Sequence, residues 1–472
     1  MNREVLISGV PNLSSEVKQA RFGDKRLTKR LGIMMEAISA NPTWGIPRLC
    51  ETQAALEGTY RFLNNDRVTP QTILAPHLAA TCERTCEGGE AIVIHDTTIF
   101  CFEGEGEREG LCQITKTKQG FFGHFALAIS SEEPNTPYGV IGLHTYTRTG
   151  DKGRRTSSQI LADPSRESLR WANLVAEVEQ RLQKRASCVH VMDREADSYE
   201  LFDFLLHNRH RFVIRIFHDR VLTPKAEGKK IFGELKSAQA VYEREVPLSP
   251  RKKSKMLGNQ KYQPARGYRV ARLTFSASAL EIACPTHLES RCAPSHKLNI
   301  VHVKEQNPPA GLDPVDWKLI TSDPIETTEQ IVRIVDTYRK RWTIEEYFKA
   351  LKTGCAYEKR QLESKRSLLN ALALFIPIAW RLLLLRSLSR YKPETDPTTA
   401  LTKTQLDVLK ACSKKKLPPK ITAYVALMAV AAMGGHIPNN GPPGWLVLGR
   451  GYDKLLTLEQ GWIAALQGCD QS

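Results

Sequence analysis

The spacing of apolar residues along the chain predicts helical, then mixed, then again helical stretches. Helices are expected over residues 14–40, 51–65 and 70–83, because their apolar residues recur at three- and four-residue intervals. Short apolar runs with β-branched residues predict strands at 91–100, 121–130, 138–148, 188–192 and 211–217. Two helices are expected between these strands, at 165–185 and 198–208. Strands interleaved with helices in this order predict an α/β fold with a mixed sheet.

The pattern also predicts where the chain divides. Residues 1–70 are expected to form a helical N-terminal domain, 71–390 an α/β domain, and 391–472 a helical C-terminal domain. Within residues 71–390, helical spacing disappears over about 219–310, which predicts a β-rich insertion with a basic loop. Residues 368–385 are the most apolar, but they include Asn370, Pro377 and Arg381, so we expect a buried helix and not a membrane span.

Charge and cysteine content narrow the class of protein. The formal net charge of +16 over 472 residues predicts a polyanionic partner such as DNA, although a protein that is basic only for solubility would share it. The eleven cysteines are scattered and form no paired Cys-x-x-Cys arrangement, so neither a disulfide scaffold nor structural zinc is expected. The first residues resemble no signal peptide. We therefore expect a cytoplasmic protein.

Two aspartates follow buried apolar runs. Asp96 is expected at the polar end of one strand, in IHDTT, and Asp193 at the end of another, in DREAD. Carboxylates that converge repel each other unless a divalent cation lies between them, so the two suggest a metal site. The structural alternative is that Asp193 only caps the helix that follows it.

A charged helix is expected over residues 338–352. At about 100° per residue, one of its faces carries a carboxylate, an aromatic hydroxyl and three cations within roughly 80°. These residues are Tyr338, Arg341, Glu345, Lys349 and Lys352. A carboxylate can bind a metal ion, and cationic side chains can bind the phosphates of DNA. The alternative is an exposed face with ion pairs between residues four apart, which leaves Tyr338 unexplained.

The arrangement Y-x-x-R-x-x-x-E-x-x-x-x-x-x-K resembles the signature of the insertion-sequence-four family of transposases. The likeness extends along most of the chain, through FGDKRLTKRL, EGTYRFLNN, IHDTT, DREAD, RFVIR, WKLITSDPIET, YRKRWTIEEYFKALKTG and MAVAAMGG. It implies a ribonuclease-H-like core and a cut-and-paste DNA transposase. The three metal-ligating carboxylates would be Asp96, Asp193 and Glu345, with two Mg²⁺ ions for which Mn²⁺ can substitute.

The resemblance also implies partners and contacts. Trp317 would stack on a flipped base during hairpin formation, and Tyr338, Arg341 and Lys352 would bind the phosphate near it. Arg215 and Lys349 would add DNA contacts. Arg30 and Arg61 match positions of the DNA-end-binding domain. The C-terminal helices resemble a dimerisation region, so a homodimer is expected to synapse two transposon ends in the bacterial cytoplasm.

Two other functions remain open from the sequence. A metal-dependent nuclease on the same fold would need the three carboxylates but not the set of Trp317, Tyr338, Arg341 and Lys352. A DNA-binding regulator derived from a transposase would be expected to lack one of the carboxylates, and the sequence retains all three. Both alternatives are less consistent with the sequence than a transposase.

Overall fold

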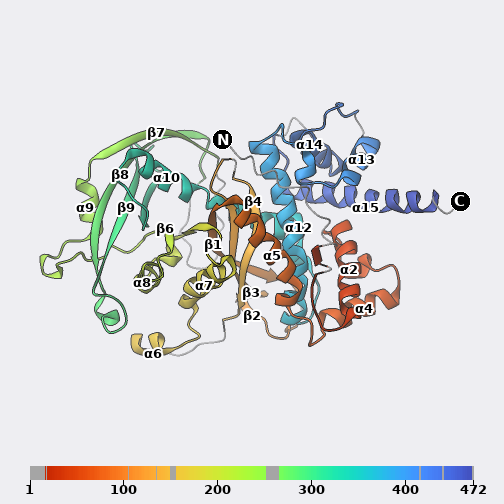
Figure 1. The fold of residues 1–472 in the computed structure, drawn as a ribbon, viewed down its shortest axis with the longest axis horizontal. Coiled ribbons are helices and arrows are strands. Elements are labelled where there is room, and N and C mark those ends of the chain that lie inside the picture. The colour runs from red at the N-terminus through yellow and green to blue at the C-terminus, as the bar shows by residue number, and fades with distance from the viewer. Residues whose placement is uncertain are drawn as a thin grey trace. The chain divides into compact units, whose positions relative to one another are not determined.

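A computed structural model describes residues 16–17, 19–104, 106–133, 135–148, 156–250, 265–413, 416–437 and 441–469. The chain forms two compact units (Figure 1). The first comprises Met1–Gly153, Leu174–Ser187 and Trp342–Ser472, and the second comprises Arg154–Asn173 and Cys188–Arg341. Of the basic loop expected in the insertion, Arg251, Lys252, Lys253, Lys255 and Lys261 lie outside the described residues.

The first unit contains four antiparallel strands. They are β1 (Glu90–Phe102), β2 (Cys112–Thr115), β3 (Lys118–Ser130) and β4 (Pro137–Tyr146), and β3 pairs with each of the other three. The strands expected at 91–100, 121–130 and 138–148 are thereby confirmed. Asp96 was expected at the end of its strand and instead lies in the middle of β1, because apolar Phe100 and Phe102 continue the buried alternation beyond the polar residues.

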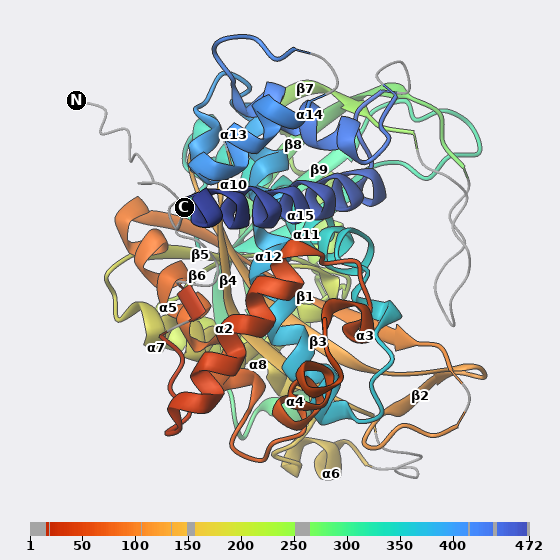
Figure 2. The ribbon, with the colours of Figure 1, turned by 90° about the vertical axis from the view of Figure 1, so that its right-hand side faces the viewer.

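The first unit also contains helices from both ends of the chain. The N-terminal ones are α2 (Lys25–Ala40), α3 (Ile46–Leu49), α4 (Gln53–Leu63) and α5 (Pro70–Gly88). The helix expected over 14–40 is interrupted, because residues 16–17 are helical and 19–24 are not. Helix α2 begins at Lys25, where Asp24 caps it by accepting a hydrogen bond from the Arg26 N–H over 2.8 Å. Figure 2 shows α2 and α4 side by side, and the two helices contact each other.

The apolar helix α12 (Lys365–Tyr391) lies in the core of the first unit. It is long and apolar enough to span a membrane, but 94% of its most apolar window is buried against other parts of the protein. It contacts α5, α14 and β4. Asn370 donates to the carbonyls of Leu63 and Val68 over 2.8 and 3.2 Å, so its polar side chain is satisfied. The expected buried helix is confirmed.

The chain ends in three further helices of the first unit. They are α13 (Lys403–Cys412), α14 (Ala423–Met433) and α15 (Trp445–Cys469). Helix α15 packs against α13 and α14 (Figure 2). It also packs against α2 and against the π-helical turn η5 (Ala350–Gly354). These helices agree with the helical character expected for residues 391–472.

The second unit contains a mixed sheet. Its strands are β5 (Ser187–Met192), β6 (Arg211–Arg215), β7 (Ala240–Leu248), β8 (Arg269–Ala283), β9 (Ser295–Glu305) and β10 (Asp316–Thr321), in the order β5-β6-β10-β9-β8-β7. Strands β5 and β6 are parallel and the remaining pairs are antiparallel. Its longer helices are α8 (Tyr199–His207) and α10 (Thr328–Arg339), and α7 (Arg170–Leu182) precedes β5. The predicted α/β class, of the ribonuclease-H-like kind, is confirmed.

Two expectations for this part of the chain are wrong in detail. The β-rich insertion also contains a short helix, α9 (Ile231–Ser237), among its strands. The single helix expected over 338–352 is divided: α10 ends at Arg339, α11 (Trp342–Lys349) begins after two turn residues, and η5 continues it in π geometry. No Gly or Pro marks the first interruption, so local preference did not reveal it.

Candidate active site and DNA-contacting residues

Asp193 follows β5, and Arg215 is the last residue of the neighbouring parallel strand β6. Met192 of β5 pairs with Ile214 of β6, so the next residue of each strand lies at the same edge of the sheet. Asp193 is half-buried, and its Oδ1 accepts a hydrogen bond from the Glu195 N–H over 2.9 Å. Asp193 thus caps the 3-10 turn Arg194–Ala196, as the structural alternative proposed. Its place at the sheet edge beside Arg215 is additional to that capping role.

Asp197, in the same DREAD motif, has a structural role. Its side chain is fully buried, and its Oδ2 accepts from the backbone N–H groups of Phe217 and His218 over 2.6 and 2.7 Å. The Arg220 guanidinium forms an ion pair with its other oxygen. These bonds join the turn after β5 to the turn after β6, so Asp197 fixes the positions of both turns.

Trp317, Tyr338 and Arg215 form a cluster at this edge. The Trp317 and Tyr338 ring centroids are 5.4 Å apart with planes at 66°, and Arg215 donates a hydrogen bond to the Tyr338 hydroxyl. Burial raises the pKa of Tyr338, and the nearby charges of Arg341 and Arg215 partly oppose that rise while Asp193 adds to it. Five residues singled out in the sequence therefore surround one another here. They are Asp193, Arg215, Trp317, Tyr338 and Arg341.

In the first unit, Asp96 and Glu345 lie on facing elements. Asp96 pairs with Phe125 of β3, so both side chains emerge from the same face of the sheet. The Phe125 ring packs 5.4 Å from that of Phe348 on α11, and Glu345 lies three residues before Phe348 on the same side of this helix. Both carboxylates are half-buried, and Asp96 Oδ1 accepts from the Thr97 N–H over 2.8 Å.

The two lysines that follow Glu345 have different surroundings. Lys349 is exposed, and its Nζ lies 2.9 Å from Oε1 of Glu346. Lys352 belongs to the π turn, donates to the Ile99 carbonyl of β1, and lies 3.6 Å from Glu358. The wider π turn separates the two cations, which a continuous α-helix would have kept on one face.

Arg30 and Arg61 lie on the two contacting N-terminal helices, α2 and α4. Arg30 passes so close to Gly58 of α4 that an added Cβ there would be 2.7 Å from its Nη2. Only glycine admits this approach without a shift of the arginine. Arg61 is exposed and pairs with Glu57 one turn earlier over 2.8 Å. Both guanidinium groups therefore belong to one small helical surface.

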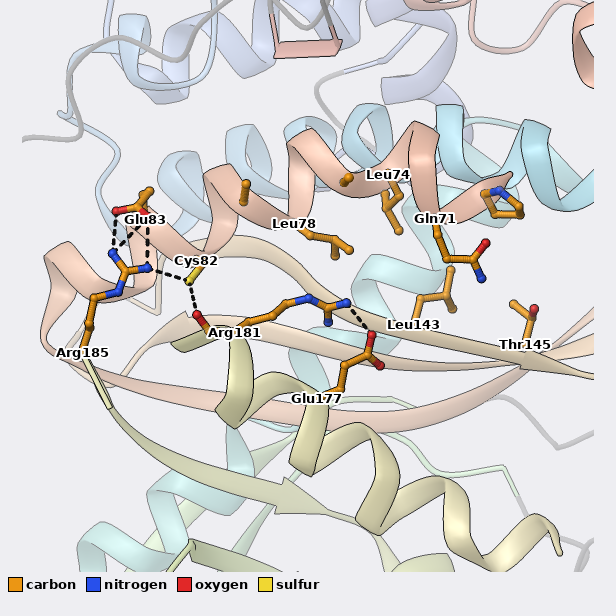
Figure 3. A pocket seen from close by; sticks show the side chains of 13 residues that line it. Gln71, Leu74, Leu78, Cys82, Glu83, Leu143, Thr145, Glu177, Arg181 and Arg185 are labelled. Carbon is orange, nitrogen blue, oxygen red and sulfur yellow. Dashed lines mark hydrogen bonds and ion pairs between the residues drawn. The ribbon is translucent and has the colours of Figure 1, made fainter. Parts of the chain in front are cut away.

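A cavity of about 470 Å³ in the first unit contains none of the predicted site residues (Figure 3). Leu74 and Leu78 of α5 and Leu143 of β4 line its apolar part. Its charged side chains neutralise each other, since Arg185 pairs with Glu83 over 3.1 Å and Arg181 pairs with Glu177. Balanced charge gives this cavity no attraction for phosphate.

The carboxylates have the donor chemistry of a Mg²⁺ or Mn²⁺ site. Those ions prefer oxygen ligands, which Asp96 and Glu345 supply on facing elements of the first unit and Asp193 supplies at a sheet edge of the second. Across the described ranges, no three or more His, Cys, Asp and Glu side chains form a group that could hold a metal ion. Carboxylate oxygens are suitable ligands for Mg²⁺ or Mn²⁺. The first unit contains two of the three predicted ligands, Asp96 and Glu345, and the second unit contains Asp193.

One residue of the site region was missed in the sequence. Glu346, next to Glu345, accepts a hydrogen bond from the Trp445 indole N–H over 3.0 Å and lies 3.6 Å from the Arg386 Nε. Both partners come from helices more than thirty positions away in the chain, α12 and α15. The pair of adjacent glutamates was the only signal in the sequence, and it does not indicate distant partners.

Comparison with known proteins identifies two domains. Residues 12–68 match a family described as Transposase DNA-binding, and residues 167–376 match one described as Transposase DDE domain. The structure of a piggyBac transposase synaptic complex with hairpin DNA is similar over 68% of this chain and 52% of that chain, with 13% identity and a TM-score of 0.32. This chain thus spans about half the length of that transposase. Two parts of the chain are thus similar to a transposase DNA-binding domain and to a transposase DDE domain.

Proposed function

We propose that this protein is a DDE transposase that excises a mobile DNA element and joins it to a target by cut-and-paste transposition. The observation that carries the proposal is the cluster at one sheet edge of the second unit. There the carboxylate Asp193 lies among Arg215, Tyr338 and Arg341, with the Trp317 ring beside them. The carboxylate can bind a metal ion, while the two guanidinium groups and the phenol can donate hydrogen bonds to a phosphodiester held by that ion.

Asp96, Asp193 and Glu345 are proposed as the ligands of two Mg²⁺ ions, which Mn²⁺ can replace. Bound ions of this kind acidify an attacking hydroxyl and neutralise charge on the leaving oxygen. These carboxylates would supply the oxygen ligands that both ions prefer.

The neighbouring side chains are proposed to orient the DNA. Because burial raises its pKa, Tyr338 stays a protonated phenol that can donate to a phosphate oxygen. Arg215 and Arg341 supply planar donors to the same phosphate, and Trp317 stacks on an unpaired base. Lys349 and Lys352 add contacts to the backbone of the DNA end.

Every chemical step is an in-line displacement at phosphorus. In the first, the oxygen of water bonds to the phosphorus, the bond to the 3′ oxygen breaks, and that oxygen takes a proton. The freed 3′-hydroxyl attacks the opposite strand to form a hairpin, which water then opens. The resulting 3′-hydroxyl attacks target DNA. One set of carboxylates serves all four displacements, because the bond changes are the same.

The remaining parts of the chain are proposed to bind and pair DNA ends. Residues 1–70, with Arg30 and Arg61, would bind the inverted repeats, and residues 71–390, including the insertion at about 219–310, would carry the chemistry. Helices of residues 391–472 would form a homodimer that synapses two ends. The protein would act in the bacterial cytoplasm, at the nucleoid.

The experiment is cleavage of a labelled duplex carrying the inverted repeats that flank the gene, with Mg²⁺ or with EDTA. Denaturing gels resolve nicks, hairpins and open ends. Hairpins that require Mg²⁺ support cut-and-paste transposition, and nicks without hairpins indicate a simpler nuclease. Binding without cleavage would contradict the proposal and indicate a DNA-binding regulator.

A further inference from the structure

Phe217 is an exposed aromatic residue at the sheet edge that carries Asp193. Its ring is 60% exposed, although the preceding residue, Ile216, is buried. Exposure of a phenylalanine to this degree costs hydrophobic free energy that burial would recover. A single exposed apolar residue is common on protein surfaces, so its surroundings must decide whether it has a function.

The backbone of Phe217 is held firmly. Its N–H donates to the buried carboxylate of Asp197 over 2.6 Å, and the N–H of His218 donates to the same oxygen. The N–H of Ile216 donates to the Lys318 carbonyl of β10 over 2.8 Å. The ring is therefore presented to solvent by a turn with fixed hydrogen bonds, which lowers the entropy lost when a ligand binds it.

The register places Phe217 opposite Trp317. Arg215 of β6 pairs with Leu319 of β10, and the bond from Ile216 to Lys318 continues this pairing by one residue. The next positions are Phe217, two residues beyond the end of β6, and Trp317 on β10. Alternation along a strand brings both side chains to the face that also carries Arg215. Two aromatic rings and a guanidinium group thus share one face next to Asp193.

We propose that Phe217 stacks on an unpaired DNA base beside the scissile phosphate. Aromatic rings between phosphate-binding cations are the means by which proteins bind single-stranded DNA, since every base has a π face. The phenyl ring makes no hydrogen bonds, so it accepts any of the four bases. This inference rests on the proposed function and adds a substrate contact to it.

The test uses full-length protein and DNA ends with 2-aminopurine at each of the first four positions in turn, bound in Ca²⁺ without cleavage. Stacking quenches 2-aminopurine fluorescence. With Phe217→Ala we expect the quenching to be lost at one position and the affinity to fall about ten-fold. Phe217→Trp should restore both, and Tyr268→Ala, which removes another exposed ring at 67% exposure, should change neither.

Quenching and affinity that are unchanged in Phe217→Ala would overturn the inference, as would equal losses in Tyr268→Ala. Cleavage of unmodified ends in Mg²⁺ by the unaltered protein separates this outcome from failure of the proposed function. If that protein cleaves and Phe217→Ala quenches normally, only the role of Phe217 is wrong. If the unaltered protein does not cleave, the proposed function is wrong as well.

Discussion

Trp445, the first residue of α15, donates its indole N–H to Oε2 of Glu346, the residue after Glu345. The Arg386 guanidinium lies 4.5 Å from the Trp445 ring centroid and 3.6 Å from the same oxygen. The helix that carries Glu345 is thereby joined to α12 and α15, and its position depends on both. The helix that holds a proposed metal ligand is thus joined to a helix proposed to take part in dimerisation.

Replacing Trp445 by Phe should lower the cleavage rate more than DNA binding. The variant keeps the ring but loses the bond to a carboxylate, which contributes about 2 kcal/mol to stability. A small displacement of Glu345 should reduce the rate at least about ten-fold. Trp462→Phe on the same helix, at 37% exposure, is the matched control. Equal rates for the two variants in single-turnover cleavage would contradict this role for Trp445.

Gly449→Ala should destabilise the first unit strongly. A Cβ at Gly449 would overlap the Gly354 carbonyl at the end of η5, and backbone cannot move aside cheaply. Gly461→Ala on the same helix meets nothing within 4 Å and should instead raise stability, because alanine favours helix by up to about 1 kcal/mol. Thermal unfolding of both variants measures the contrast. A lower midpoint for Gly461→Ala than for Gly449→Ala would refute the close packing.

Asp453 should make stability fall as the pH rises. Burial raises the pKa of Asp453 from 3.8 to about 6, against the hydrogen bonds from Thr43 and the charges of Arg360 and Arg48. The folded state therefore binds this proton more tightly than the unfolded state. The stabilisation that protonated Asp453 gives the folded state is fully present below pH 3.8 and is lost as the pH rises through about 6.

The measurement is the urea midpoint at pH 4.5, 5.5 and 6.5 for Asp453→Asn and for the unaltered protein. The amide that Asp453→Asn introduces cannot ionise, so we expect a shallower decline with pH in the variant. Asp407→Asn on α13, whose side chain is 42% exposed, should leave the decline as it was. Identical pH profiles for Asp453→Asn and the unaltered protein would show that this carboxyl does not titrate in the range.

Arg341→Ala should weaken binding to DNA ends and reduce its salt dependence. If Arg341 contacts one phosphate, the slope of log affinity against log salt should become shallower by about 0.9. Arg291→Ala, an exposed arginine between β8 and β9, should leave the slope unchanged. Fluorescence anisotropy at four salt concentrations gives both slopes. A slope in Arg341→Ala equal to that of the unaltered protein would exclude the phosphate contact.

Much of the fold was predictable because apolar spacing is a local property. The strands expected at 188–192 and 211–217 followed from short buried runs, and Asp193 follows the first of them as predicted. The parallel pairing that brings Asp193 next to Arg215 was not predicted. Asp96 was misplaced within its strand because Asp, Thr and Thr weaken the alternation that Phe100 and Phe102 restore. Polar residues on a covered strand are stabilised by tertiary contacts, which the local pattern does not contain.

The break between Arg339 and Trp342 and the π turn at Ala350 were not predictable in the same way. Residues 340–349 contain no Gly or Pro, so no helix breaker marks the interruption. It accompanies packing such as that of Phe348 and Tyr347 on Phe125. The partners of Glu346 and the exposure of Phe217 also depend on distant segments. The sequence showed which chemical groups are present, but only the tertiary structure shows where they lie.

The most direct test is end cleavage by Asp96→Asn, Asp193→Asn and Glu345→Gln, with binding of the same DNA measured in parallel. Each substitution keeps the shape of the side chain and removes a charge that a metal ion needs. The account predicts that all three variants bind DNA ends and none cleaves them in Mg²⁺, while Glu195→Gln, in the same turn as Asp193, cleaves normally. Cleavage at an undiminished rate by any of the three would contradict the proposed catalytic site.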